Sequence, residues 1–125
     1  MKRNISPIFL ALACVGTLAW ASCRDTKKQE KFLGRWEVVG GTMNKLSTDQ
    51  FNGFYLDMSP DGVLKSNVNS TANDETGTFE VRGNTLVQNT TEKIRFDVEK
   101  VEDSLMQLST EMRGFEFVFV FKKKN

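Results

Sequence analysis

Apolar and polar residues alternate with a period of two in short runs along most of the chain after Phe32, and this pattern constrains the fold most strongly. The cleanest run is Ile94–Glu99, in which every second residue is apolar and the residues between them are charged. Successive side chains of a β-strand point to opposite faces of a sheet, so this alternation predicts strands with one buried face. Helical periodicity is scarce in the same region. We therefore expect an all-β domain.

Eight strands are expected, and most of them are joined by connections of hairpin length. Pro60-Asp61-Gly62 is a strong signal for a tight turn, and Gly83-Asn84 suits a two-residue hairpin. The longer connection 42–53 has room for a helical turn capped by Ser47 or Thr48. The expected strands cover residues 35–40, 54–59, 63–68, those around 79–81, 85–89, 94–99, 104–110 and 115–121.

The last of these strands is apolar on both faces, with four phenylalanines on one face and Val118 and Val120 on the other. Its outer face should therefore be covered by the tether, a partner or a second copy. A long open meander exposes two edges, and pairing of the last strand with the first removes both. The expected fold is a small eight-stranded antiparallel up-and-down barrel.

The first 22 residues have the pattern of a secretory signal peptide, with a basic start, an apolar centre over 8–20 and small residues before Cys23. Ala21-Ser22-Cys23 resembles the processing box of bacterial lipoproteins, in which the cysteine carries acyl chains such as palmitate. We therefore expect lipidation at Cys23. An uncleaved anchor and plain secretion are the alternatives.

This interpretation divides the chain into a signal peptide at 1–22, a lipidated N-terminus and polar tether at 23–31, and a domain at 32–125. Cys14 would leave with the signal peptide, so Cys23 would remain as a single cysteine and no disulfide would form. The expected location is the bacterial cell envelope. Mixed charges after Cys23, in place of an acidic run, favour the outer membrane with the domain facing the periplasm.

The charge of the domain is close to neutral. Of the 17 Lys and Arg residues, Lys2 and Arg3 lie in the predicted signal peptide, which leaves 15 basic against 16 acidic residues. This balance gives no electrostatic reason to expect nucleic acid or an anionic membrane surface as a partner. We expect the membrane to be reached through the lipid anchor.

Leu33-Gly34-Arg35-Trp36 resembles the Gly-x-Trp signature on the first strand of lipocalins. Pro60-Asp61-Gly62, the run 77–86 and the aromatic last strand follow in the order seen in the lipocalin-like domains of bacterial envelope lipoproteins. The resemblance covers about 32–124 and implies that Gly34, Trp36 and a basic residue late in the last strand close the barrel. By position the nearest match to that basic residue is Lys122. Trp36 would either seal the closed end or contact a ligand.

Histidine is absent, and with Cys23 acylated the domain lacks the usual nitrogen and sulfur ligands of zinc and the commonest general base. We expect no metal and no cofactor. The polar loop 69–75 could supply oxygen ligands to calcium from Asn69, Asn73, Asp74 and Glu75, and a solvated turn is the alternative. We expect no enzymatic activity, because alternation places outward most of the carboxylates that could form a catalytic pair: Glu80, Asp97, Glu99, Glu111 and Glu116.

An eight-stranded barrel can be filled by side chains or can hold one small ligand. Short strands and a large aromatic load favour filling over a wide cavity, and a pocket would be narrow, apolar and at the open end. The candidate ligand-lining or core residues are Phe54, Leu56, Phe79, Ile94, Phe96, Phe117 and Phe119.

Two functions remain open. The first is binding of a small hydrophobic ligand in the barrel or at its mouth. The second is a filled barrel that acts as a protein-binding or inhibitory module through its loops and the Val118/Val120 face, with an envelope protein as partner. Separately, Asp103-Ser104-Leu105 resembles a site at which some envelope bacteria attach O-glycans, and an ordinary Asp-Ser turn is the alternative.

Overall fold

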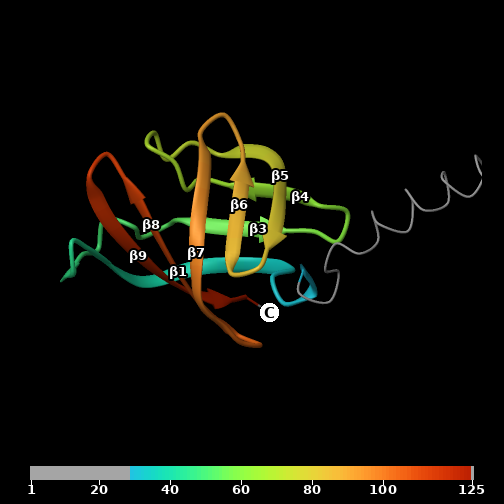
Figure 1. Ribbon diagram of the computed structural model, residues 1–125, viewed down its shortest axis with the longest axis horizontal. Coiled ribbons are helices and arrows are strands. Elements are labelled where there is room, and N and C mark those ends of the chain that lie inside the picture. The colour runs from blue at the N-terminus through green and yellow to red at the C-terminus, as the bar shows by residue number, and fades with distance from the viewer. Residues whose placement is uncertain (1–28, 125) are drawn as a thin grey trace, which may run out of the picture.

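Nine antiparallel strands form one sheet that closes on itself in the computed structural model, which describes residues 29–124 (Figure 1). Each strand pairs with neighbours in the order β2-β1-β3-β4-β5-β6-β7-β8-β9, and β1 also pairs with β9. The strands are β1 (Gly34–Met43), β2 (Leu46–Ser47), β3 (Tyr55–Met58), β4 (Val63–Ser66), β5 (Glu75–Arg82), β6 (Thr85–Asn89), β7 (Lys93–Val101), β8 (Leu105–Met112) and β9 (Phe115–Lys123). The eight-stranded antiparallel barrel expected from the alternation is confirmed, with β2 as a short addition.

Closure of the barrel depends on β1, which pairs with both β3 and β9. Its first residues, Gly34–Glu37, pair with β3, while the stretch from Trp36 to Met43 pairs with β9. The register with β9 shifts between Val38 and Gly40, which marks a bulge at Val39. A bulge bends a strand and increases its twist, and this allows one strand to bridge the two ends of a sheet. The pairing removes the free edges that the meander would otherwise expose.

The connection after β1 differs in part from the expectation. Asn44 and Lys45 adopt positive φ angles of 51° and 69°, and the chain turns back to form the two-residue strand β2 on β1. A turn follows in which the Thr48 hydroxyl accepts a hydrogen bond from the Gln50 amide at 3.1 Å. The residues after Thr48 form turns and not a helix. Their effect is to direct Phe51 back into the barrel, where it is buried.

Inward side chains of all the long strands meet in one core. The space enclosed by Leu56, Met58, Leu64, Phe79, Leu86 and Phe96 has no room for a water molecule, so this part of the barrel is filled, as the aromatic load predicts. Within residues 29–124 the structure has no helix with the length and apolar character needed to cross a bilayer. The predicted signal peptide, Cys14, Cys23 and most of the predicted tether lie outside the described residues.

Candidate functional site

The end of the barrel where the chain enters is sealed by Trp36. This side chain is fully buried, and its indole Nε1 donates a hydrogen bond to the Phe32 carbonyl at 2.9 Å. The ammonium of Lys123 lies 4.9 Å from the centre of the indole ring, within the range of a cation–π contact. Gly34 has a φ of +112°, and a Cβ there would lie 3.4 Å from the Lys123 side chain. Gly34 and Trp36 therefore have the closing positions that the sequence motif implied.

The cation over Trp36 was expected to be Lys122, and this expectation is wrong by one residue. On β9 the buried phenylalanines are Phe119 and Phe121, so the next inward position is Lys123. Lys122 falls on the outer face, where it is exposed and opposite Glu37 on β1. Continuing the alternation of the strand past its last phenylalanine would have given the correct lysine.

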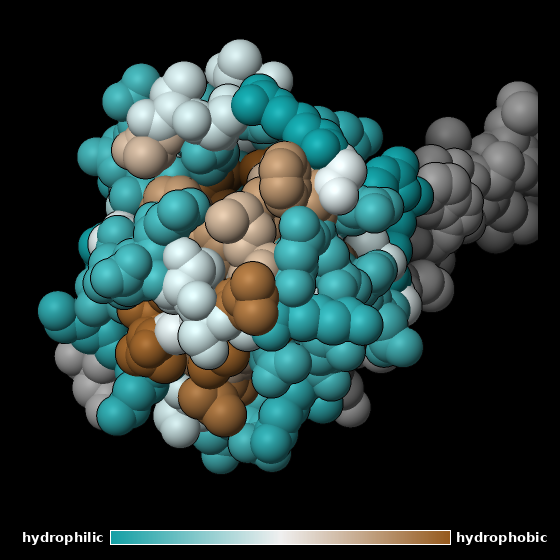
Figure 2. Space-filling view, turned by 90° about the vertical axis from the view of Figure 1, so that its left-hand side faces the viewer, coloured by the Kyte–Doolittle hydropathy of each residue, from teal (hydrophilic) through white to brown (hydrophobic). Residues whose placement is uncertain are grey.

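The opposite end of the barrel is open and contains a pocket of about 340 Å³. Figure 2 faces this end and shows apolar residues gathered around a hollow. Three of the candidate residues line it, namely Phe54, Phe117 and Phe119. The other four, Leu56, Phe79, Ile94 and Phe96, are buried in the core and do not line it. The remaining wall and rim residues are Met43, Gln50, Phe51, Val68, Asn69, Ser70, Glu92, Met112, Arg113 and Phe115.

Phe51 is a buried aromatic lining residue that sequence reasoning missed. Its ring centre lies 4.6 Å from that of Phe119, 5.7 Å from Phe117 and 5.9 Å from Phe54. It reaches this position because Gly41 lacks a side chain: a Cβ there would lie 2.7 Å from the Phe51 ring and 2.5 Å from the Val118 carbonyl oxygen. Alternation of apolar and polar residues could not identify either residue. Phe51 lies in a turn, and Gly41 has no side chain to indicate which face of β1 is buried.

A buried polar network supports the opposite wall of the pocket. Gln88 lies inside the barrel, and its Nε2 donates to the Val68 carbonyl at 2.9 Å and to the Thr90 hydroxyl at 3.0 Å. The Ser66 hydroxyl donates to Gln88 Oε1 at 3.0 Å and accepts from the Val68 amide at 2.9 Å. Buried polar groups are costly unless they are paired, and here each one has a partner. The network fixes the backbone at Val68, which lines the pocket.

The polar groups of the loop after Val68 bond to one another and to Glu92. Asn69 Oδ1 accepts hydrogen bonds from the Thr71 amide, the Thr71 hydroxyl and the Asn73 amide, and the Glu92 carboxylate accepts from the Ser70 amide and hydroxyl. These contacts match the alternative of an ordinary polar turn. Among the described residues, no group of three or more Cys, Asp or Glu side chains could hold a metal ion.

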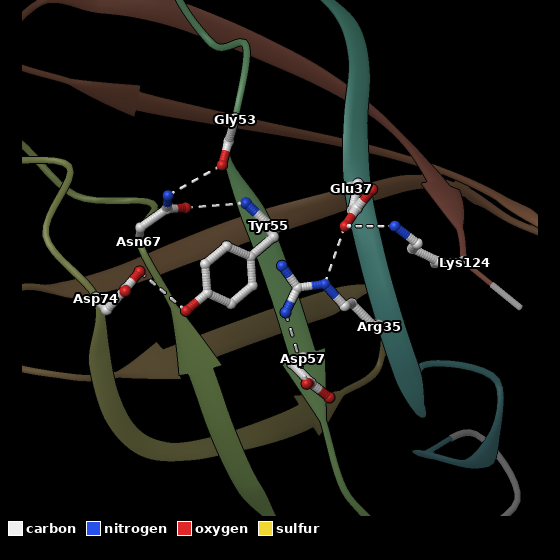
Figure 3. A network of polar contacts seen from close by, with 8 residues as sticks. All are labelled: Arg35, Glu37, Gly53, Tyr55, Asp57, Asn67, Asp74 and Lys124. Carbon is white, nitrogen blue, oxygen red and sulfur yellow. Dashed lines mark hydrogen bonds and ion pairs between the residues drawn. The ribbon is translucent and has the colours of Figure 1, made fainter.

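A second polar network lies on the outer wall, over β1 and β3 (Figure 3). Arg35 Nε lies 3.0 Å from the Glu37 carboxylate, its Nη1 lies 4.0 Å from Asp57, and its guanidinium lies 4.2 Å from the centre of the Tyr55 ring. The Arg35 hydrogen bond lowers the pKa of Glu37. Partial burial, followed by the hydrogen bond that Tyr55 donates to Asp74, raises the pKa of Tyr55. The ion pair of Arg35 with Asp57 and its contact with the Tyr55 ring link β1 to β3.

The remaining candidate positions are distributed over the outer surface. Val118 and Val120 are half-buried, and Val39 at the neighbouring bulge is 59% exposed. Ser104 is exposed in the turn before β8. The carboxylates of Asp97, Glu99, Glu111 and Glu116 are exposed as alternation indicates, and Glu80 bonds to Arg82 and Asn89.

No family model matches the chain, and no curated protein matches its sequence. A crystal structure of a lipocalin-like protein from Bacteroides uniformis ATCC 8492 matches the fold, with a TM-score of 0.56 and 13% identity over 75% of this chain and 99% of the other. The fold of this chain is lipocalin-like. An uncharacterized protein from Bacteroides eggerthii DSM 20697 also matches the lipocalin-like barrel, with a TM-score of 0.53 and 12% identity over 74% and 98% of the two chains.

Proposed function

We propose that this chain binds a small hydrophobic ligand at the open end of its lipocalin-like barrel. The observation that carries the proposal is the pocket of about 340 Å³ at that end, lined mainly by phenylalanine and methionine side chains. Ligand pockets are concave, mostly apolar and typically about 300–1,000 Å³, so this one suits a small molecule. Apolar surface left open at one end of an otherwise filled core costs stability, which a ligand would recover on binding.

The chain further fits a protein held in the bacterial envelope by lipid on Cys23, facing the periplasm from the outer membrane. The signal-like pattern of 1–22 and the sequence Ala21-Ser22-Cys23 support this part of the proposal. We propose no catalytic role. The polar side chains around the pocket include one carboxylate, Glu92, which is bonded to Ser70.

Fluorescence titration tests the ligand proposal. The chain from Arg24 onward contains every strand of the barrel and would be titrated with N-phenyl-1-naphthylamine and with cis-parinaric acid. We expect saturable binding of at least one probe. Phe117→Arg should weaken it by at least tenfold, about 1.4 kcal/mol, because it places a charge in the apolar wall. Val118→Arg, the adjacent residue on the outer face, is the matched control. Absence of saturable binding to either probe would contradict the proposal.

A protein-binding role is the second candidate, and a specific observation favours it. Leu46 on β2 is 73% exposed and Phe115 at the start of β9 is 45% exposed. Two hydrogen bonds join the turns that carry them, from the Asn44 amide to the Glu116 carbonyl and from the Glu116 amide to Asn44 Oδ1. Exposed apolar side chains grouped in this way are typical of interaction surfaces.

The second candidate predicts that a partner is captured from solubilised envelope by the lipidated chain and is lost on Leu46→Lys or Phe115→Lys. Val120→Lys tests the outer face in the same experiment. A pull-down that captures the same proteins with all three variants as with the parent chain would count against a specific protein-binding surface.

A further inference from the structure

Four of the five phenylalanine rings that line the pocket form two near-parallel pairs. Phe117 and Phe119 on β9 are stacked, with 11° between their planes and 6.2 Å between their centres. Phe51 and Phe54, from the connection before β3, form a second stacked pair with 21° between their planes and 5.9 Å between their centres. Phe51 meets Phe117 at 68° and Phe119 at 57°. The two pairs therefore meet at a steep angle, and we call this arrangement the corner.

A corner of this kind suits a flat ring. Aromatic groups attract one another most strongly in offset-stacked and edge-to-face arrangements, with ring centres about 4.5–7 Å apart. A planar ligand parallel to one pair of rings lies at a steep angle to the other pair, so both kinds of contact are available to it. Met43 and Met112 also line the pocket, and thioether sulfur makes favourable contacts with ring edges.

The floor of the pocket limits the length of the ligand. Phe119 forms part of the wall and is almost fully buried, and the core residues Phe96, Leu108 and Phe121 are fully buried. Further along the barrel, the space bounded by Leu56, Leu64 and Phe79 cannot admit a water molecule. A long alkyl chain would have to displace core side chains to enter along the barrel axis. A ligand therefore fits at the mouth only if it is compact.

We propose that the pocket selects compact aromatic ligands, with one or two fused rings, over aliphatic chains of similar size. This rests on the proposed function, since it names the ligand class of the same site. The corner formed by Phe51, Phe54, Phe117 and Phe119 is the specificity-determining element.

Calorimetric titration with two carboxylates of similar size and equal charge, 1-naphthaleneacetic acid and decanoic acid, tests the inference on the chain from Arg24 onward. Because stacking and edge contacts add to simple burial, we expect the naphthalene compound to bind about tenfold more tightly. Phe51→Leu and Phe117→Leu keep an apolar side chain and remove a ring, so each should reduce this preference by about threefold to tenfold. Decanoate affinity should change by less than about twofold in both variants.

A control and a second ring variant separate selectivity from folding. Phe121→Leu alters a buried ring on the same face of β9 that does not line the pocket, so it should weaken the core without changing the preference. Phe117 is half-buried, so Phe117→Leu remains informative if the Phe51 variant does not fold. Equal or tighter binding of decanoate, or a preference unchanged in the ring variants, would overturn the aromatic selectivity while leaving ligand binding intact. If neither compound binds, and neither probe of the preceding section does, the proposed function itself fails.

Discussion

Phenylalanines on the inner face of β9 contribute to both ends of the barrel. The two ends differ in which residues cover these rings. Along the inner face of β9, Phe121 is fully buried, Phe119 is 1% exposed, Phe117 is half-buried and Phe115 is 45% exposed. At the closed end Trp36 and Lys123 complete the packing. At the open end the cover is a turn that contributes Phe51. One row of phenylalanines thus serves as core at one end and as a binding surface at the other.

The largest expected effect is at the closed end. Trp36→Ala should destabilise the protein by about 3–5 kcal/mol, because it removes a fully buried indole and leaves a cavity. Phe115→Ala at the open end should cost less than about 1 kcal/mol, as is usual for partly exposed sites. Urea denaturation of both variants measures the difference. A similar loss of unfolding free energy in the two variants would contradict the view that the closed end mainly stabilises the fold while the open end mainly serves binding.

Gly41 connects the open end to the fold. Gly41→Ala places a Cβ against the Phe51 ring and the Val118 carbonyl, so it should cost about 1–3 kcal/mol and should also weaken ligand binding by shifting Phe51. The neighbouring Gly40 has open space around a Cβ, and Gly40→Ala should change stability by no more than about 0.5 kcal/mol. Thermal unfolding and probe titration would check both effects. Equal behaviour of the two alanine variants would refute the role given to Gly41.

Gln88 tests whether the wall at Val68 depends on the buried network. Gln88→Leu removes the donor to the Val68 carbonyl and the acceptor of the Ser66 hydroxyl, which should cost about 1–3 kcal/mol. Hydrogen exchange of the Val68 amide, which bonds to Ser66, should accelerate. Gln107→Leu on β8, where the glutamine is half-buried, is the matched control and should leave that amide protected. An unchanged exchange rate of the Val68 amide in Gln88→Leu would show that the Gln88 network does not hold this part of the pocket wall.

The corrected position of the closing cation predicts a smaller effect. Lys123→Gln should cost about 0.5–1 kcal/mol by removing the charge over the Trp36 ring, while Lys122→Gln should have a smaller effect. Tryptophan fluorescence during urea unfolding reports both, and in Lys123→Gln the emission of the folded protein should also shift. A larger loss in Lys122→Gln would reverse the assignment.

The weakest expected effect is a pH dependence at the closed end. The pKa of Glu37 is lowered in the folded chain, first by its hydrogen bond to Arg35 and also by Lys124, so the ionised form stabilises the fold. This contribution is present above the pKa of an unfolded glutamate, about 4.3, and is lost as the pH falls through the lower folded-state value. Glu37→Gln should therefore lower the melting temperature slightly at pH 7 and leave it unchanged near pH 2. If the difference in melting temperature between the parent chain and Glu37→Gln grew as the pH was lowered, this prediction would be contradicted.

Much of the barrel could be predicted, because alternation directly reports which side of a strand is buried. Residues 85–89 were placed as a strand with the observed ends, and the Gly34–Trp36 motif indicated the closed end correctly. Alternation continued past Phe121 on β9 also identifies Lys123 as the inward lysine. The pocket was harder to predict, since Phe51 acts from a turn and Gly41 acts through an absent side chain. Gln88 is buried beside Leu86 and Val87, where no alternation marks a polar residue as inward.

The hydrogen bond from Trp36 to the Phe32 carbonyl fixes where the polypeptide enters the barrel. Residues 29–33 and the turn between β8 and β9 lie on opposite sides of Figure 1, so the chain enters at the end away from the pocket. A lipid on Cys23, as we propose, would therefore attach the chain on the side of the barrel away from the mouth of the pocket. A ligand would then reach the pocket without passing the site of attachment.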